Sequence, residues 1–180
     1  MTTNGLLNIG IYFLVLLAIT KPLGLYMAKL FEGERTFLYP VLRPLEKLVY
    51  RLCGIREDVE QRWTEYSASL LALSLVSFLF VYVIERLQGI LPFNPMHFGA
   101  SQAPSYATAV TPDLAFNTST SFLTNTNWQA YGGESTFSYF VQMAALAVQN
   151  FISPAVGICA ALAFVRGFSR HEMKTIGNFG

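Results

Sequence analysis

Residues 111–134 read TPDLAFNTSTSFLTNTNWQAYGGE, and this polar stretch decides the fold because apolar segments lie on both sides of it. It begins with a helix start: Thr111 can cap, Pro112 fits the first helical position, and Asp113 favours the positive end of the helix dipole. A helix over 113–123 has 11 residues and is roughly 16 Å long, about half of a bilayer. The stretch therefore predicts a short helix that does not cross a membrane.

Three apolar stretches accompany this short helix. They cover residues 6–25, 66–84 and 137–165, and a membrane-crossing helix needs roughly 20 apolar residues. The first stretch is marginal, since Lys21 and Pro22 interrupt it. In the whole chain 53% of residues are hydrophobic and 13% are charged, whereas a soluble domain carries about 25% charged residues. The fold class we predict is an all-α membrane protein with three transmembrane helices and one re-entrant helix.

Basic residues predict the orientation of these spans. The segment after the first span is rich in them: Lys29, Arg35, Arg43, Lys47, Arg51, Arg56 and Arg62. Residues 87–165 contain neither Lys nor Arg. Because cytoplasmic loops carry the excess of positive charge, we expect the N-terminus outside, residues 29–65 inside, and the C-terminus of this segment inside.

The inner loop contains a short amphipathic helix. Apolar residues recur at helical spacing, at Leu45, Leu48, Val49 and Leu52. We expect Pro44 in its first turn and Gly54 at its exit. Such a helix either lies in the lipid interface or docks a partner.

The short helix between the second and third spans is oriented to attract a cation. It enters from outside, so its C-terminus, which carries roughly half a negative charge, points toward the membrane centre. No acidic residue lies between Asp113 and Glu134. Irregular backbone at membrane depth is tolerated only where it is buried in protein or lines a wet cavity. We therefore predict a re-entrant loop that holds a cation with backbone oxygens rather than with carboxylates.

The residues that follow this helix have the character of a potassium filter. Such a filter needs successive carbonyl oxygens that replace the hydration shell of the ion. This geometry needs positive φ at alternate residues, where asparagine is the commonest residue after glycine, and Thr124, Asn125, Thr126 and Asn127 alternate accordingly. Their hydroxyls and amides are further candidate ligands. The alternative, a polar outer loop leading into the third span, stays open.

Other polar residues extend this candidate site. Trp128 is a candidate to brace the filter through its ring and N–H, and Gln129 is expected toward the outer mouth. Gln149 and Asn150 in the third span are candidates to line the path below the filter. Hydrogen bonding between helices explains these last two equally well.

The motifs closely resemble those of the potassium-binding A subunit of the Kdp potassium-transporting P-type ATPase, in its N-terminal portion. The resemblance is carried by DLAFNT…SFLTNTNWQAYGGE and by SYFVQMAALAVQNFISPAVGICAALAFVRGFSR. KPLG at 21–24 resembles the first span of that family, and LPFNPMHF at 91–98 resembles its first outer loop. The resemblance covers nearly the whole chain, but family members are about three times as long.

This resemblance implies four successive span–pore helix–span units, each supplying one quarter of a filter, with one extra span at each end. The chain would hold the extra first span and the first unit, with K⁺ at Thr124, Asn125, Thr126 and Asn127. It implies a non-catalytic subunit in the bacterial inner membrane that takes K⁺ from outside and delivers it to the pump subunit. ATP hydrolysis belongs to that B subunit, and a C subunit and a small F peptide complete the complex.

The expected organisation follows from these observations. We assign 1–28 to the first span, 29–65 to a cytoplasmic loop with the amphipathic helix, 66–168 to the first pore unit, and 169–180 to the next cytoplasmic segment. The unit divides into span 66–86, outer loop 87–111, pore helix and filter 112–128, and span 137–165.

Several functions have no support in the sequence. A net charge of +1 disfavours nucleic-acid binding. We find no nucleophile, carboxylate pair or metal cluster, so no metal is expected beyond K⁺ and no other cofactor. Two alternatives remain open beside the ATP-driven importer: the pore subunit of an ATP-independent K⁺ transporter or channel, and a non-conducting assembly subunit whose polar loop only docks partners.

Overall fold

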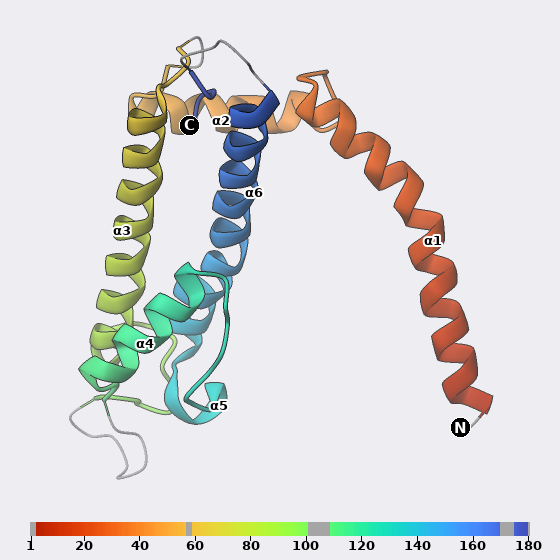
Figure 1. Cartoon of the computed structure of the whole chain (residues 1–180). Coiled ribbons are helices and arrows are strands. Elements are labelled where there is room, and N and C mark those ends of the chain that lie inside the picture. The colour runs from red at the N-terminus through yellow and green to blue at the C-terminus, as the bar shows by residue number, and fades with distance from the viewer. Residues whose placement is uncertain (1–2, 57–58, 101–108, 170–174, 180) are drawn as a thin grey trace. The chain divides into compact units, whose positions relative to one another are not determined.

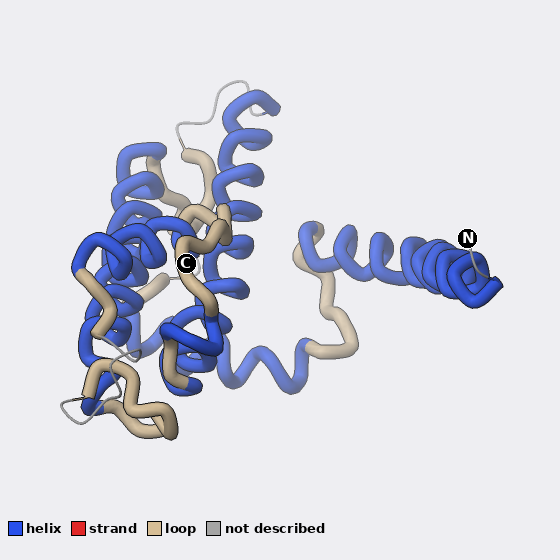
Figure 2. Tube along the Cα trace, turned by 90° about the horizontal axis from the view of Figure 1, so that it is seen from below, coloured by secondary structure: helices blue, strands red, loops and turns tan. Residues whose placement is uncertain are grey.

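The computed structural model describes residues 3–56, 59–100, 109–169 and 175–179, and these form helices joined by loops (Figure 2). Three helical segments are long and apolar enough to cross a membrane: Thr3–Phe31, Trp63–Ile90 and Val141–Ser169. The described residues form no β-strand, only an isolated bridge between Gln61 and Gly177. The predicted all-α membrane fold is therefore confirmed.

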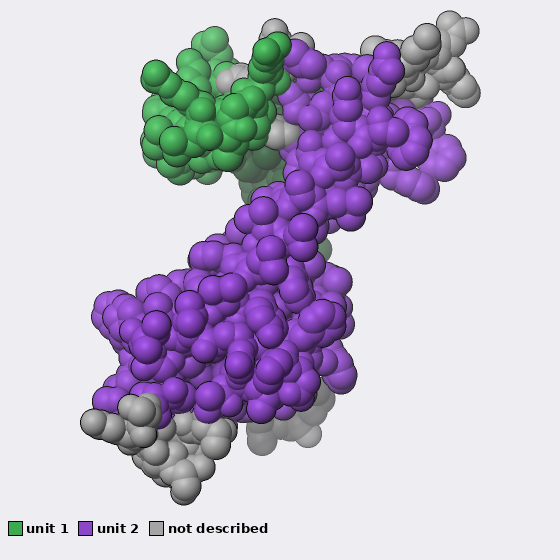
Figure 3. Space-filling model, turned by 90° about the vertical axis from the view of Figure 1, so that its left-hand side faces the viewer, with its two compact units in different colours: residues 1–56 green, residues 57–180 purple. Residues whose placement is uncertain are grey.

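The chain divides into two compact units, residues 1–56 and 57–180 (Figure 3). The first unit contains α1 (Thr3–Phe31) and α2 (Tyr39–Cys53). Gly54 ends α2 in the left-handed conformation, with φ of 66°, as expected for a helix exit. The expectation for Pro44 is wrong. Helix α2 begins earlier, with a proline already in its first turn, so Pro44 lies inside the helix at the cost of one backbone hydrogen bond.

The second unit holds a short helix between two long ones. Helix α3 (Trp63–Leu87) continues into η1 (Gln88–Ile90), and η2 (Val141–Ala147) continues into α6 (Val148–Ser169). Between them lie α4 (Pro112–Leu123) and the single turn α5 (Gly133–Thr136). The Tyr66 hydroxyl donates to the Cys159 carbonyl at 2.7 Å and links the two long helices.

Helix α4 reaches only part of the way along its long neighbours. Its 12 residues give a length of about 18 Å. Figure 1 shows it beginning near the C-terminal end of α3 and ending near the middle of α6. The chain then returns by a loop to α5, on the side where α4 began (Figure 1). The loop that follows α4 thus begins at mid-height in the pair of long helices.

The core of this unit packs α4 against α3 and η2. Its buried apolar residues are Val81, Val110, Ala115, Phe122, Phe137, Val141, Ala145 and Leu146. Phe78 of α3 meets Phe116 of α4 edge to face, with ring centroids 5.4 Å apart. Tyr131 meets Phe137 in the same way at 4.5 Å. These contacts hold α4 on one side and leave the loop after it uncovered in this chain.

Gln88 joins the end of α3 to the segment that leads into η2. It is buried, its Nε2 donates to the Thr136 carbonyl at 3.0 Å, and its Oε1 accepts from the Ser138 amide at 3.1 Å. The Gln88 carbonyl accepts from Asn94 Nδ2 at 3.1 Å. Asn94 also closes the loop after η1, because its side chain bonds both the amide and the carbonyl of Phe98.

We expect Gln88→Ala to destabilise the fold. It leaves the Ser138 amide and the Thr136 carbonyl without their partner, and each such buried group costs about 1–3 kcal/mol. The thermal midpoint of the native protein in detergent is expected to fall clearly. Gln88→Glu is the matched control: it keeps the acceptor for Ser138 and loses the donor, so an intermediate midpoint is expected. Equal midpoints for all three proteins would contradict the bridging role.

Candidate functional site

The first turn of α4 is built by Thr111, Pro112 and Asp113. Thr111 is the N-cap residue, with extended backbone, and its carbonyl accepts from the Ala115 amide at 2.9 Å. Its side chain makes no capping hydrogen bond to the backbone. The hydroxyl instead bonds the exposed Asp113 side chain and thereby lowers the pKa of that carboxyl. The helix start therefore carries a negative charge at neutral pH, on the positive end of the dipole.

The loop after α4 folds back onto the last turn of the helix. The amides of Thr126 and Asn127 both donate to the Ser121 carbonyl, at 2.9 and 3.2 Å. The Ser121 hydroxyl donates to the Trp128 carbonyl at 2.9 Å. The last carbonyls of a helix have no partner within the helix. The amides of the loop supply the hydrogen bonds that the Ser121 carbonyl would otherwise lack.

The backbone of this loop alternates as the sequence predicts. Asn125 and Asn127 have φ of 55° and 56°, the left-handed conformation that asparagine tolerates better than most residues. No described residue donates a hydrogen bond to the carbonyl oxygens of Thr124, Asn125, Thr126 or Asn127. All four residues are exposed in this chain. Four consecutive carbonyls thus lie beyond the negative end of α4 without a donor among the described residues.

Several side chains of the loop take part in hydrogen bonds. The Thr124 hydroxyl lies 2.9 Å from the Thr120 carbonyl and 2.7 Å from the Thr126 hydroxyl. Asn125 Oδ1 accepts from Asn127 Nδ2 at 3.4 Å. The side chains of the loop thus bond one another, whereas its carbonyl oxygens accept no hydrogen bond from a described residue.

Trp128 and Gln129 lie at the end of the loop. The Trp128 side chain is 58% exposed, and its indole N–H has no hydrogen-bond acceptor among the described residues. Trp128 is held in this chain through its carbonyl instead. Gln129 is also exposed. Burial raises the pKa of the neighbouring Tyr131 to about 12, so its hydroxyl keeps its proton near neutral pH.

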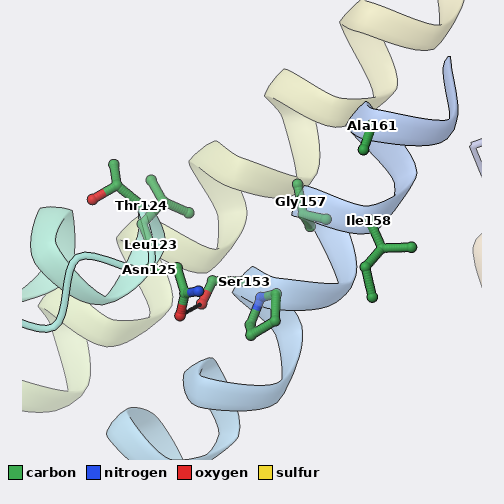
Figure 4. A pocket seen from close by; sticks show the side chains of 9 residues that line it. Leu123, Thr124, Asn125, Ser153, Gly157, Ile158 and Ala161 are labelled. Carbon is green, nitrogen blue, oxygen red and sulfur yellow. Dashed lines mark hydrogen bonds between the residues drawn. The ribbon is translucent and has the colours of Figure 1, made fainter. Parts of the chain in front are cut away.

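A pocket opens between the loop and α6 (Figure 4). It has a volume of about 520 Å³, and its lining includes Leu123, Thr124, Asn125, Ser153, Gly157 and Ala161. In Figure 4 Asn125 and Ser153 approach each other from the loop and from α6, and the Ser153 hydroxyl lies 3.4 Å from Asn125 Oδ1. Ser153 is the thirteenth of the 29 residues in Val141–Ser169. The loop therefore meets the third long helix near its middle.

The structure does not bring every predicted residue to this pocket. Gln149 is buried, and Asn150 is exposed, but neither lines the pocket. The Gln149 carbonyl accepts from the Ser153 hydroxyl at 2.8 Å. Among the polar residues of the third span, Ser153 is thus the one that reaches the loop. Ser121 was not predicted at all. Its position in the last turn of the expected helix was the available signal.

Glu85 is a buried carboxyl in the second unit. It lies in α3, its side chain is 0% exposed, and neither of its oxygens has a hydrogen-bond partner among the described residues. It forms no ion pair with any residue that the structure describes. The described residues contain no cluster of His, Cys, Asp and Glu suited to a metal ion. Glu85 therefore makes no hydrogen bond to the described residues of the loop.

Comparisons with known proteins agree on one family. The family model KdpA, described as the potassium-transporting ATPase A subunit, matches residues 10–180. Proteins named potassium-transporting ATPase potassium-binding subunit from Brucella anthropi and Solibacter usitatus are each 54% identical over 179 residues. One from Koribacter versatilis is 52% identical over the same length. Each match covers 99% of this chain, but only 29–30% of the length of the relative.

We expect Glu85→Gln to leave the protein as stable as before, or to stabilise it. A carboxyl buried without a partner keeps its proton, because the charged form is costly there, and glutamine keeps the shape of this neutral side chain. The measurement is the thermal midpoint of the native protein in detergent. Glu134→Gln in α5, which is exposed, is the control. A clear fall of the midpoint for Glu85→Gln alone would mean that the carboxylate has a partner outside the described residues.

Proposed function

Because the chain belongs to the family of potassium-transporting ATPase A subunits, we propose that residues 124–127 form one quarter of a potassium selectivity filter. In this proposal the chain is part of the potassium-binding, channel-like subunit of an ATP-driven importer. It is a multi-pass membrane protein, in agreement with its three long apolar helices. The matched portion spans about 30% of the first relatives, so the whole transporter includes elements beyond those described.

The main support for this proposal is the row of four backbone carbonyls that follows α4. No described residue donates to the carbonyl oxygens of residues 124–127, and φ is positive at every second residue. A potassium filter replaces the hydration shell of the ion with oxygens in such a row. Helix α4 points its C-terminus at them, and its partial negative charge favours a cation there. No carboxylate is needed, which suits a site that must also release the ion.

The ion path follows from the proposed orientation. We place the N-terminus and the loop 87–111 outside, with residues 29–65 and the C-terminal segment inside, in a bacterial inner membrane. Extracellular K⁺ would then enter at the Trp128 and Gln129 side and leave the filter toward the pocket below it. Ser153 and Gly157 line that pocket. Gln149 and Asn150 stay candidates for a path in the assembled transporter.

The partners and the chemistry follow from the family. The relatives are named as the potassium-binding subunit of a transporting ATPase, which supports a partner that hydrolyses ATP. We propose that this partner is a P-type pump subunit and that a C subunit and a small F peptide complete the assembly. The present chain would bind and pass on K⁺ without catalysing a reaction. The alternatives of an ATP-independent pore and of a non-conducting assembly subunit are decided by the experiments below.

We expect Asn127→Val to weaken K⁺ recognition and Asn127→Gly to preserve it. Glycine adopts positive φ freely, whereas a β-branched residue does so at a cost of roughly 1–2 kcal/mol. The K⁺ concentration for half-maximal uptake is therefore expected to rise about tenfold for valine and to change little for glycine. The measurement is K⁺ uptake and its inhibition by Na⁺ in cells that depend on this transporter. The filter proposal would be contradicted if Asn127→Val and Asn127→Gly both assembled and both kept the K⁺ affinity and selectivity of the wild type.

We expect the native protein to copurify with a P-type ATPase subunit whose hydrolysis of ATP is stimulated by K⁺. Gentle affinity purification followed by mass spectrometry identifies the partners and the intact mass in one experiment. The Asn127→Val variant is the internal control. In the proposed importer it copurifies normally but needs more K⁺ to stimulate ATP hydrolysis. Potassium flux without any ATPase partner would favour the ATP-independent pore, and variants that disturb only assembly would favour a docking subunit.

A further inference from the structure

Ser121 occupies a special place between α4 and the proposed filter. It lies in the last turn of α4 and is 2% exposed. Its carbonyl accepts two amide hydrogen bonds from the loop, from Thr126 and Asn127, and also lies 3.4 Å from the Thr124 hydroxyl. Its hydroxyl donates a third to the Trp128 carbonyl at 2.9 Å. One residue therefore contacts three consecutive residues of the loop.

The third hydrogen bond separates Trp128 from the residues before it. The carbonyls of residues 124–127 have no donor among the described residues, whereas the Trp128 carbonyl is held by the Ser121 hydroxyl. A carbonyl that faces the pore helix at hydrogen-bond distance does not also face the ion path. The row of unbonded carbonyls therefore ends at Asn127, and the Ser121 hydroxyl marks that end.

We propose that Ser121 is a positioning residue that sets the outer end of the selectivity filter by holding the Trp128 carbonyl toward α4. The inference rests on the proposed function of residues 124–127 and adds the group that limits their number. Ser121 does not touch the ion. It acts through the orientation of the peptide plane between Trp128 and Gln129 and through the amides of Thr126 and Asn127.

Ion selectivity is the property that this hydroxyl controls. Discrimination between K⁺ and Na⁺ depends on the number of coordinating carbonyls and on their spacing. Without the hydroxyl, the Trp128 carbonyl has no hydrogen-bond donor. It can regain a favourable contact by turning toward water or the ion. The Trp128 carbonyl then coordinates the same ion as the Asn127 carbonyl. The distance between neighbouring carbonyls at Asn127 is then less strictly fixed. A weaker preference for K⁺ results, even where the assembly is intact.

The test is Ser121→Ala in the complete transporter. The measured quantity is the ratio of the half-maximal concentrations of Na⁺ and K⁺ for stimulation of ATP hydrolysis, together with the yield of assembled complex. Loss of a single neutral hydrogen bond is expected to lower this ratio by about three- to tenfold. The yield of complex is expected to stay close to that of the wild type.

Ser119→Ala is the matched control. Ser119 lies on the same helix two residues earlier and is 0% exposed, and its hydroxyl has no hydrogen-bond partner among the described residues. The substitution removes the same group from a similar environment without a contact to the loop, so the Na⁺ to K⁺ ratio is expected to be unchanged. Ser121→Thr keeps a hydroxyl at the position and is expected to restore the ratio.

The outcomes separate this inference from the proposed function. If Asn127→Val changes the K⁺ affinity but Ser121→Ala behaves like Ser119→Ala, the filter stands and the role of Ser121 is overturned. The role is also overturned if Ser121→Ala lowers only the yield, or if an assembled Ser121→Thr has the alanine phenotype. If neither Asn127→Val nor Ser121→Ala alters ion preference, the filter proposal itself fails. A Ser121→Thr variant that does not assemble leaves the decision to the alanine pair.

Discussion

The amides of Thr126 and Asn127 share the Ser121 carbonyl, and the path of the chain after α4 depends on this pair of hydrogen bonds. The end of a helix exposes carbonyls that need donors, and in a membrane water does not supply them freely. The loop provides two amides for one such carbonyl. Its own carbonyls at residues 124–127 accept no hydrogen bond from the part of the chain that the structure describes. The same arrangement that satisfies the helix end therefore leaves the row of carbonyl oxygens that the proposed filter would use.

The rest of the second unit supports α4 from one side. Val81, Phe122 and Val141 belong to the core that joins α3, α4 and η2, and Gln88 ties the two segments that flank this core. The other side of the loop is exposed and opens into the pocket beside α6. A filter needs several such units around one axis. The exposed side is where further units of a longer transporter would meet this one under the proposed function.

The pocket connects the loop with the third long helix. Ser153 reaches Asn125 across 28 positions of sequence and also bonds the Gln149 carbonyl one turn earlier in its helix. Asn125 is one of the two residues with positive φ in the loop. The conformation of the proposed filter is therefore coupled to α6 as well as to α4.

The sequence by itself determined the three long apolar helices, the start of α4 at Pro112, and the alternation of backbone conformation at Asn125 and Asn127. Each of these depends on local properties: apolar length, the fixed φ of proline, and the tolerance of asparagine for positive φ. The tertiary structure alone decided the contacts of single polar groups. The Ser121 hydroxyl bonds the Trp128 carbonyl, and Ser153 rather than Gln149 or Asn150 reaches the loop. Glu85 is buried without a hydrogen-bond partner among the described residues. Such contacts depend on which side chains meet after the helices pack, and sequence spacing does not specify that.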